Sequence, residues 1–309
     1  MAAAAVGVAQ SPVSVELRDL ILLKPAGESL KLTTPRIRAF AAGGHLSAFK
    51  GRGVEFDESR PYQHGDDLRT IDWRVTARTG KPHTKVFREE RNRPVIVWLD
   101  LGRSMMFATR GAYKAVIGAQ LAALVGWSAV ANGDQLGGLV FSEHEHSELR
   151  PRLGRRAALR LFQLIASPSC WQPRPAADGT GGMERALLRL TRVARPGSMM
   201  FLFSDFRTLD ADAERHVRQL ASHGDLFLVD IYDPVEAELP PPGRYRIEMG
   251  ARSFAIDTHD ARLRELHKER FAARMERLRA LARAPGITLL QCSTAEDPYD
   301  VLARRFVRA

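Results

Sequence analysis

The sequence contains little cysteine. Only Cys170 and Cys292 occur among 309 residues, and they form no close-spaced pair. A structural zinc site needs thiolates and imidazoles at short spacings, and a disulfide framework needs several cysteines. The sequence has a pattern for neither, so it predicts a reduced, cytoplasmic compartment.

Targeting segments and long apolar runs are also scarce. The first twenty residues contain no basic stretch followed by an apolar core, so we expect no signal peptide. Residues 115–133 are nearly apolar over the length of a short membrane span, but Gln120 and Ser128 interrupt them. A helix that is apolar all round is typical of the centre of a large α/β domain, and we predict that role here.

Lysine is rare, although the chain is basic. Lysine and arginine total 46 against 36 acidic residues, and only 7 of the 46 are lysine. This bias is what GC-rich coding would give, and the arginines are spread along the whole chain. The most basic predicted helix, residues 262–283, also carries Glu265, Glu269 and Glu276, which indicates a solvated face with i,i+4 pairs. The net positive charge alone would allow nucleic-acid binding, which we keep as an alternative function. It predicts that the affinity for nucleic acid falls steeply as the salt concentration rises.

Apolar strands alternate with helices from Pro94 onward. The expected strands are residues 94–100, 135–142, 198–205, 226–233 and 287–293, and the expected helices are residues 112–132, 154–167, 183–194, 210–224, 261–283 and 297–307. Short apolar runs without alternation are typical of strands buried on both faces. The pattern predicts an α/β fold with a doubly wound, mostly parallel sheet and helices on both faces.

Three regions follow from these patterns. Residues 1–33 are expected to be a flexible arm, because their alanine-rich start offers few packing contacts. Residues 34–93 are expected to form a small β-containing unit, since two alternating stretches flank a charged segment. Residues 94–309 form the α/β domain, which includes a predicted hairpin at residues 243–257.

The charged segment carries a specific motif. It contains Gly65-Asp66-Asp67, then Arg69, then Ile71-Asp72-Trp73. This GDD-x-R-x-IDW pattern resembles the signature of the bacterial family numbered fifty-eight among the domains of unknown function. The resemblance covers roughly residues 35–309 and implies a von Willebrand factor A-like, or Rossmann-like, domain. Many members carry two transmembrane helices that this chain lacks, so we expect a short soluble form.

The resemblance also implies a function. Genes of this family often lie beside genes for MoxR-type AAA+ ATPases. We therefore expect a non-enzymatic protein-interaction module that works with such an ATPase, or with another protein, in protein assembly or maturation. The oligomeric state does not follow from the sequence.

A metal site is implied by the von Willebrand A-like fold. Such domains bind Mg²⁺ or Mn²⁺ with an Asp-x-Ser-x-Ser loop, a threonine and a further aspartate, all hard oxygen ligands. Asp100, Ser104 and Asp205 match three of these positions, but Gly102 replaces the first serine. The threonine position falls on Gly181, with Thr180 one residue early.

The implied metal site is therefore expected to be degenerate, with low Mg²⁺ occupancy. An alternative interpretation needs no metal. Asp100 would accept hydrogen bonds from its own loop, Ser104 would cap the helix that follows, and Asp205 would cap a helix or pair with an arginine.

The motif segment also has two interpretations. Its charged residues could form a network that fixes the small unit against the main domain, with Trp73 as a packing anchor. Alternatively, Arg69, Asp72 and Trp73 could bind a partner, because tryptophan and arginine are enriched at interface hot spots.

Enzyme motifs are absent from the sequence. It has no Walker A loop, no G-x-S-x-G and no H-E-x-x-H. A metal-dependent hydrolase built on Asp100 and Asp205 would lack an activated nucleophile and a further general base. We therefore predict that the chain is not an enzyme.

Overall fold

The structure, a computed structural model, contains two compact units. It describes residues 11–32, 54–63, 70–89, 92–143, 145–172, 182–249 and 252–307. The larger unit comprises Met1–Ile37 and Arg93–Ala309, and the smaller comprises Arg38–Asn92. Thr180, Gly181 and Arg69 lie outside the described residues.

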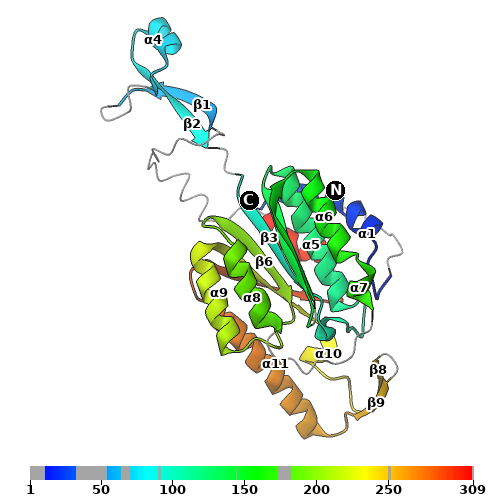
Figure 1. Ribbon diagram of the computed structural model, residues 1–309. Coiled ribbons are helices and arrows are strands. Elements are labelled where there is room, and N and C mark those ends of the chain that lie inside the picture. Colours follow the sequence, from blue (N-terminus) through cyan, green and yellow to red (C-terminus); the bar gives the residue numbers. More distant parts are fainter. Residues whose placement is uncertain are drawn as a thin grey trace. The chain divides into compact units, whose positions relative to one another are not determined.

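A six-stranded sheet forms the centre of the larger unit, in the order β10-β7-β6-β3-β4-β5 (Figure 1). Its strands are β3 (Pro94–Asp100), β4 (Gln135–Phe141), β5 (His146–Leu153), β6 (Ser198–Ser204), β7 (Gly224–Tyr232) and β10 (Ile287–Ser293). All neighbours pair in parallel except β5, which runs antiparallel to β4 at one edge. The strand order reverses its direction between β3 and β6, and ligands of open α/β sheets bind at the carboxyl ends of strands at such a point.

Two hydrophobic clusters cover the two faces of the sheet. Alternate residues of β3 divide between them, with Val97 and Leu99 in one cluster and Ile96 and Trp98 in the other, as the strand period of two requires. The first cluster includes residues of α5 (Lys114–Ala131), α6 (Arg155–Ile165) and α12 (Pro298–Phe306), and the second includes residues of α8 (Gly182–Val193), α9 (Ala211–His223) and α11 (Ala261–Ala282). The predicted α/β chain with a mostly parallel sheet is confirmed.

Shorter elements connect these layers. They are η2 (Arg103–Met105), α7 (Pro168–Trp171), α10 (Pro234–Ala237) and the antiparallel pair β8 (Arg244–Met249) and β9 (Arg252–Asp257). Asp233 caps the start of helix α10, because its side chain accepts a hydrogen bond from the Val235 N–H at 3.0 Å. The elements η2 and α10 follow strand ends, so they bring polar residues to the carboxyl edge of the sheet.

Helix α5 is the central helix of the larger unit, as predicted. In the described part of the chain it alone is long and apolar enough to cross a membrane, and 83% of it is buried inside the fold. Its polar interruption has a structural role, because the Ser128 hydroxyl donates to the Leu30 carbonyl at 2.7 Å. The Trp127 indole N–H donates to the Leu20 carbonyl at 2.9 Å.

The expected loose arm is wrong for residues 11–32. These residues form α1 (Leu17–Leu22) and α2 (Lys24–Ser29), which pack against α5. Leu20 and Leu30 are fully buried. The segment is ordered because its few leucines complete the core around α5, and α5 side chains bond to its carbonyl groups. Neither contact has a local sequence signal.

The smaller unit is a hairpin that carries one short helix. Strands β1 (Val54–Pro61) and β2 (His83–Glu89) pair antiparallel, and α4 (Trp73–Thr79) lies between them in sequence. An isolated bridge joins Ile71 to Thr84 just before α4. The motif residues Ile71, Asp72 and Trp73 therefore lie at the junction of the hairpin and the helix.

Candidate functional site

Asp100 lies at the end of β3 and is buried. One carboxylate oxygen accepts a hydrogen bond from the Gly102 N–H at 2.8 Å, and the other accepts one from the Ser204 hydroxyl at 2.7 Å. Burial raises the pKa of Asp100 to about 7, and the Asp205 and Glu143 carboxylates act in the same direction. The two hydrogen bonds oppose this shift only in part. Burial therefore favours the neutral form of Asp100 more than it would at an exposed aspartate.

The loop after Asp100 is fitted to glycine at position 102. A Cβ atom there would lie 2.9 Å from an Asp100 oxygen and 3.0 Å from Glu143 Oε1, which is closer than normal contact. The same Glu143 oxygen accepts the Arg103 N–H at 2.6 Å. A serine at position 102 would thus have to displace two carboxylates. Ser104 lies half-buried in η2.

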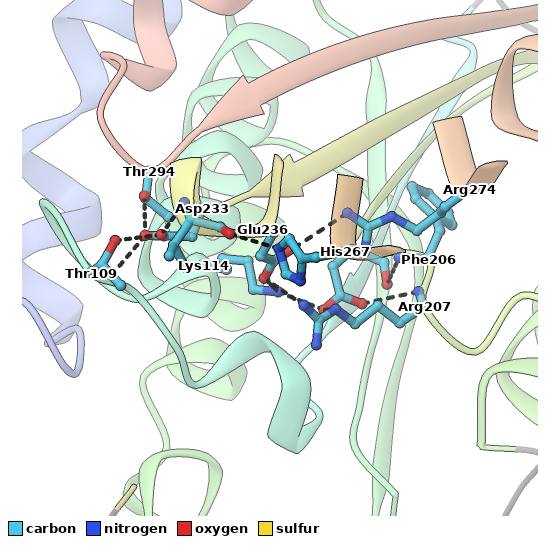
Figure 2. A network of polar contacts seen from close by, with 12 residues as sticks. Thr109, Lys114, Phe206, Arg207, Asp233, Glu236, His267, Arg274 and Thr294 are labelled. Atoms are coloured by element: carbon cyan, nitrogen blue, oxygen red, sulfur yellow. Dashed lines mark hydrogen bonds and ion pairs between the residues drawn. The ribbon is translucent and has the colours of Figure 1, made fainter. Parts of the chain in front are cut away.

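Asp205 follows β6 directly and is 1% exposed. Its Oδ2 atom accepts a hydrogen bond at 2.6 Å from Lys114 Nζ, which is fully buried at the start of α5 (Figure 2). Lys114 Nζ donates a second hydrogen bond, also at 2.6 Å, to Glu236 Oε1 on α10. Burial opposes ionisation of Asp205, but the Lys114 ammonium outweighs it, assisted by Arg207, and holds the pKa of Asp205 below its ordinary value.

Two arginines complete the charge balance around Glu236. Arg207 approaches Glu236 Oε1 at 3.2 Å, and Arg274 of α11 donates to Oε2 at 3.3 Å (Figure 2). Nearby Asp230 of β7 is fully buried, and neither of its carboxylate oxygens has a hydrogen-bond partner within the described structure. Burial raises the pKa of Asp230 to about 7, although Arg274 attracts its charged form.

A further carboxylate, that of Asp233, ties three loops together. It accepts hydrogen bonds from both the N–H and the hydroxyl of Thr109 and, at 2.8 Å, from the hydroxyl of Thr294 (Figure 2). Burial opposes ionisation, but these hydrogen bonds hold the pKa of Asp233 below its ordinary value. The loops after β3, β7 and β10 are thereby fixed relative to one another.

The side-chain oxygens in the described part of this site do not match the set of ligands that a divalent cation needs. Asp205 is already neutralised by Lys114, and both oxygens of Asp100 accept hydrogen bonds. Mg²⁺ requires several free oxygen ligands in octahedral geometry. Nowhere in the described ranges do three His, Cys, Asp or Glu residues come together in a metal-binding group. The arrangement fits a built-in ammonium ion. Asp205 does approach an arginine, Arg207 at 3.7 Å, as the metal-free interpretation allowed, but its main partner is Lys114 at 2.6 Å, which that interpretation did not name.

The family resemblance predicted that Asp100 and Asp205 belong to one site. Neither the resemblance nor the sequence pattern predicted the other charged residues of the site, which are Lys114, Asp230, Asp233 and Glu236. A signal for Lys114 was available. It is one of only 7 lysines, and it begins the most apolar helix of the chain. A charge at the start of an otherwise buried helix requires a buried partner.

Comparison with known proteins assigns this chain to a family. Residues 58–277 match the family model described as "Protein of unknown function DUF58". This chain belongs to that family. It is 29% identical over 280 residues to the uncharacterized proteins Rv1480 of Mycobacterium tuberculosis (strain ATCC 25618 / H37Rv) and Mb1516 of Mycobacterium bovis, which covers 89% of this chain and 86% of each relative.

Solved structures give weaker likenesses. An aerotolerance-related membrane protein from Bacteroides fragilis NCTC 9343 is 13% identical with a TM-score of 0.40. The conserved hypothetical protein BatB from Bacteroides thetaiotaomicron is 15% identical with a TM-score of 0.38. Each match covers 69% of this chain and 96% of the other.

Two neighbouring residues of the motif segment, Asp72 and Trp73, differ in burial and in role in this DUF58 chain. Asp72 is buried and caps α4, because its Oδ1 accepts the N–H groups of Arg74 and Val75 at 3.2 Å each. Its Oδ2 accepts the Ser59 hydroxyl at 2.9 Å. Trp73 is 72% exposed, so it makes little packing contact within its own unit. That it anchors this unit against the main domain stays a prediction. Partner binding by Trp73 stays a prediction.

The basic helix α11 pairs its arginines differently from the expected i,i+4 pattern. Arg277 donates to Glu214 of α9, Arg274 to Glu236 of α10, and Arg283 to Glu276, seven residues away. Two of these pairs hold α11 against other elements of the DUF58 chain. The pairing also reduces the positive charge that α11 would offer to a phosphate backbone.

Proposed function

We propose that this chain is a non-enzymatic protein-interaction module that works with a MoxR-type AAA+ ATPase in protein assembly or maturation. The observation that carries the proposal is Trp73. A large aromatic side chain that is 72% exposed within its own unit is costly to leave in water, and tryptophan is among the residues most enriched at interface hot spots. The buried cap Asp72 fixes the helix that presents it. The resemblance to the family supports the choice of partner.

The proposal includes a degenerate adhesion-type site in the larger unit. The reversal of strand order between β3 and β6, with Asp100 and Asp205 following those strands, supports a von Willebrand A-like arrangement. Lys114 supplies the positive charge that a divalent cation would supply in a complete site. Partner binding should therefore need no Mg²⁺. The two isolated cysteines support a cytoplasmic location.

Replacing Trp73 with alanine is expected to weaken partner binding at least about tenfold, because truncation of a tryptophan hot spot typically costs 2 kcal/mol or more. The chain would be co-expressed with a MoxR-type ATPase from the same genome and purified by affinity, once with Mg²⁺ and once with EDTA. Recovery of the ATPase should be equal in both buffers and should drop in W73A.

The matched control is Leu153→Ala, which removes a side chain that is 52% exposed on the edge strand β5. This variant should retain the ATPase. Two results would contradict the proposal: no ATPase recovered with the unaltered chain, or equal recovery with W73A. If the ATPase were recovered with Mg²⁺ but not with EDTA, the proposal that partner binding needs no Mg²⁺ would be wrong.

A further inference from the structure

A cavity of about 520 Å³ lies beside the buried ion-pair network. It is lined by the loop after β6, by Glu236 of α10 and by one face of α11. Its apolar lining comes from Phe206, Leu209 and Phe271. The volume falls within the range of small-ligand pockets, so it can hold two or three side chains.

The loop that lines this cavity is conformationally constrained. Phe206 has φ 49° and is the single non-glycine residue with positive φ in the described ranges. This conformation is unfavourable for a bulky side chain and persists only where surrounding contacts impose it. The Ser204 hydroxyl, which bonds Asp100, also accepts the Phe206 N–H at 3.1 Å. The site and the apolar lining of the cavity are therefore built by one strained turn.

The polar lining of the cavity is cationic. Four arginines and one histidine line it, against the single carboxylate of Glu236. Glu236 is already engaged by Lys114, Arg207 and Arg274. Arg274 Nε is buried without a hydrogen-bond partner in the described structure.

Arg270 is the most available of the cations. It is exposed, and no ion pair or hydrogen bond involves it anywhere in the described part of the chain. The guanidinium group is a planar fork of donors that matches a carboxylate geometrically. An anion that enters the cavity would therefore find one free guanidinium at the edge and a partly satisfied one deeper inside.

We propose that this cavity binds an acidic peptide segment of a partner protein, with a carboxylate at Arg270 and a neighbouring apolar side chain against Phe206 and Phe271. This assignment rests on the proposed protein-interaction function and names the chemistry that the partner must present. A free phosphate ion would leave the apolar lining unused. A nucleic-acid strand needs an extended basic track, whereas Arg274 and Arg277 of α11 are already paired with Glu236 and Glu214.

The test uses the full-length chain and fluorescence anisotropy at about 150 mM salt, where weak surface attraction is screened. The probe is a labelled, end-blocked peptide of sequence Asp-Phe-Glu-Asp. We expect saturable binding, and at least about tenfold weaker binding when Asn-Phe-Gln-Asn replaces it, because a charge-assisted hydrogen bond is lost. A peptide with serine in place of phenylalanine should bind at least about threefold more weakly.

The protein-side variant is Arg270→Glu. It alters an exposed residue, so folding should be retained, and circular dichroism would verify this. Affinity for the acidic peptide should fall at least about tenfold. Arg279→Glu is the matched control, because it makes the same charge change on α11 at a residue that does not line the cavity. It should change affinity less than about twofold.

Several outcomes would overturn the assignment. These are equal binding of the acidic and amide peptides, equal losses in R270E and R279E, or equal binding of the serine peptide together with full displacement by inorganic phosphate. Failure of the proposed function would look different. If the peptide binds as expected but no MoxR-type ATPase co-purifies, the cavity assignment stands and the partner is wrong; the reverse pattern removes only the cavity assignment.

Discussion

Replacing Lys114 with methionine is expected to lower the free energy of unfolding by about 3–5 kcal/mol, the typical loss when one member of a buried ion pair is removed. Methionine keeps the length of the side chain but removes its charge. Asp205 and Glu236, which both lie 2.6 Å from Lys114 Nζ, would remain buried with less compensating charge. Urea unfolding at pH 7 would measure the change.

The loss should be smaller at pH 5. Without the ammonium, desolvation is no longer outweighed and raises the pKa of Asp205, so this carboxylate takes up a proton as the pH falls. Lys268→Met is the matched control, since Lys268 is exposed on α11. It should change stability by less than about 0.5 kcal/mol. A loss below about 1 kcal/mol in K114M would mean that the ammonium does not balance these charges.

Replacing Asp230 with asparagine is expected to stabilise the protein above pH 7. The pKa of Asp230 is raised from 3.8 to about 7 in the folded state. Below pH 3.8 both states hold the proton, and stability is unaffected. As the pH rises from 3.8 to 7, the unfolded chain releases a proton that the folded chain retains, so stability falls. Above about pH 7 the folded chain also releases this proton, so stability falls no further.

The size of this effect follows from linkage. One pKa unit corresponds to about 1.4 kcal/mol, so between pH 5 and pH 8 the stability advantage of D230N should grow by up to about 3 kcal/mol. Urea unfolding across this range would measure it. Asp300→Asn, at an exposed position on α12, should show no such growth. An advantage of D230N that is the same at pH 5 and pH 8 would contradict the raised pKa.

The apolar pattern predicted much of the larger unit because its physics is local. Strands β3 and β6 are continuous apolar runs, as burial on both faces requires, and each is followed or ended by an aspartate. Parallel strands bring their carboxyl ends to one edge, so Asp100 and Asp205 could be assigned to the same region from sequence. The prediction of helix α5 as a core element rested on the same kind of pattern.

Other features could not be predicted because they depend on distant contacts. The order of residues 11–32 comes from hydrogen bonds of Trp127 and Ser128, about a hundred residues away in sequence. The arginines of α11 were expected to pair within the helix, but Arg277 pairs with Glu214 of α9.

The sequence by itself determined that Asp100 ends one buried strand and Asp205 follows another, because the apolar run of a strand is a property of neighbouring residues. Only the tertiary structure decided the state of those carboxylates. Lys114 neutralises Asp205 and Glu236, which lie 91 and 122 residues away, whereas Asp230 lacks a hydrogen-bond partner within the described structure. Desolvation and Coulomb attraction depend on distance and burial in space, and neither quantity can be read from positions along the chain.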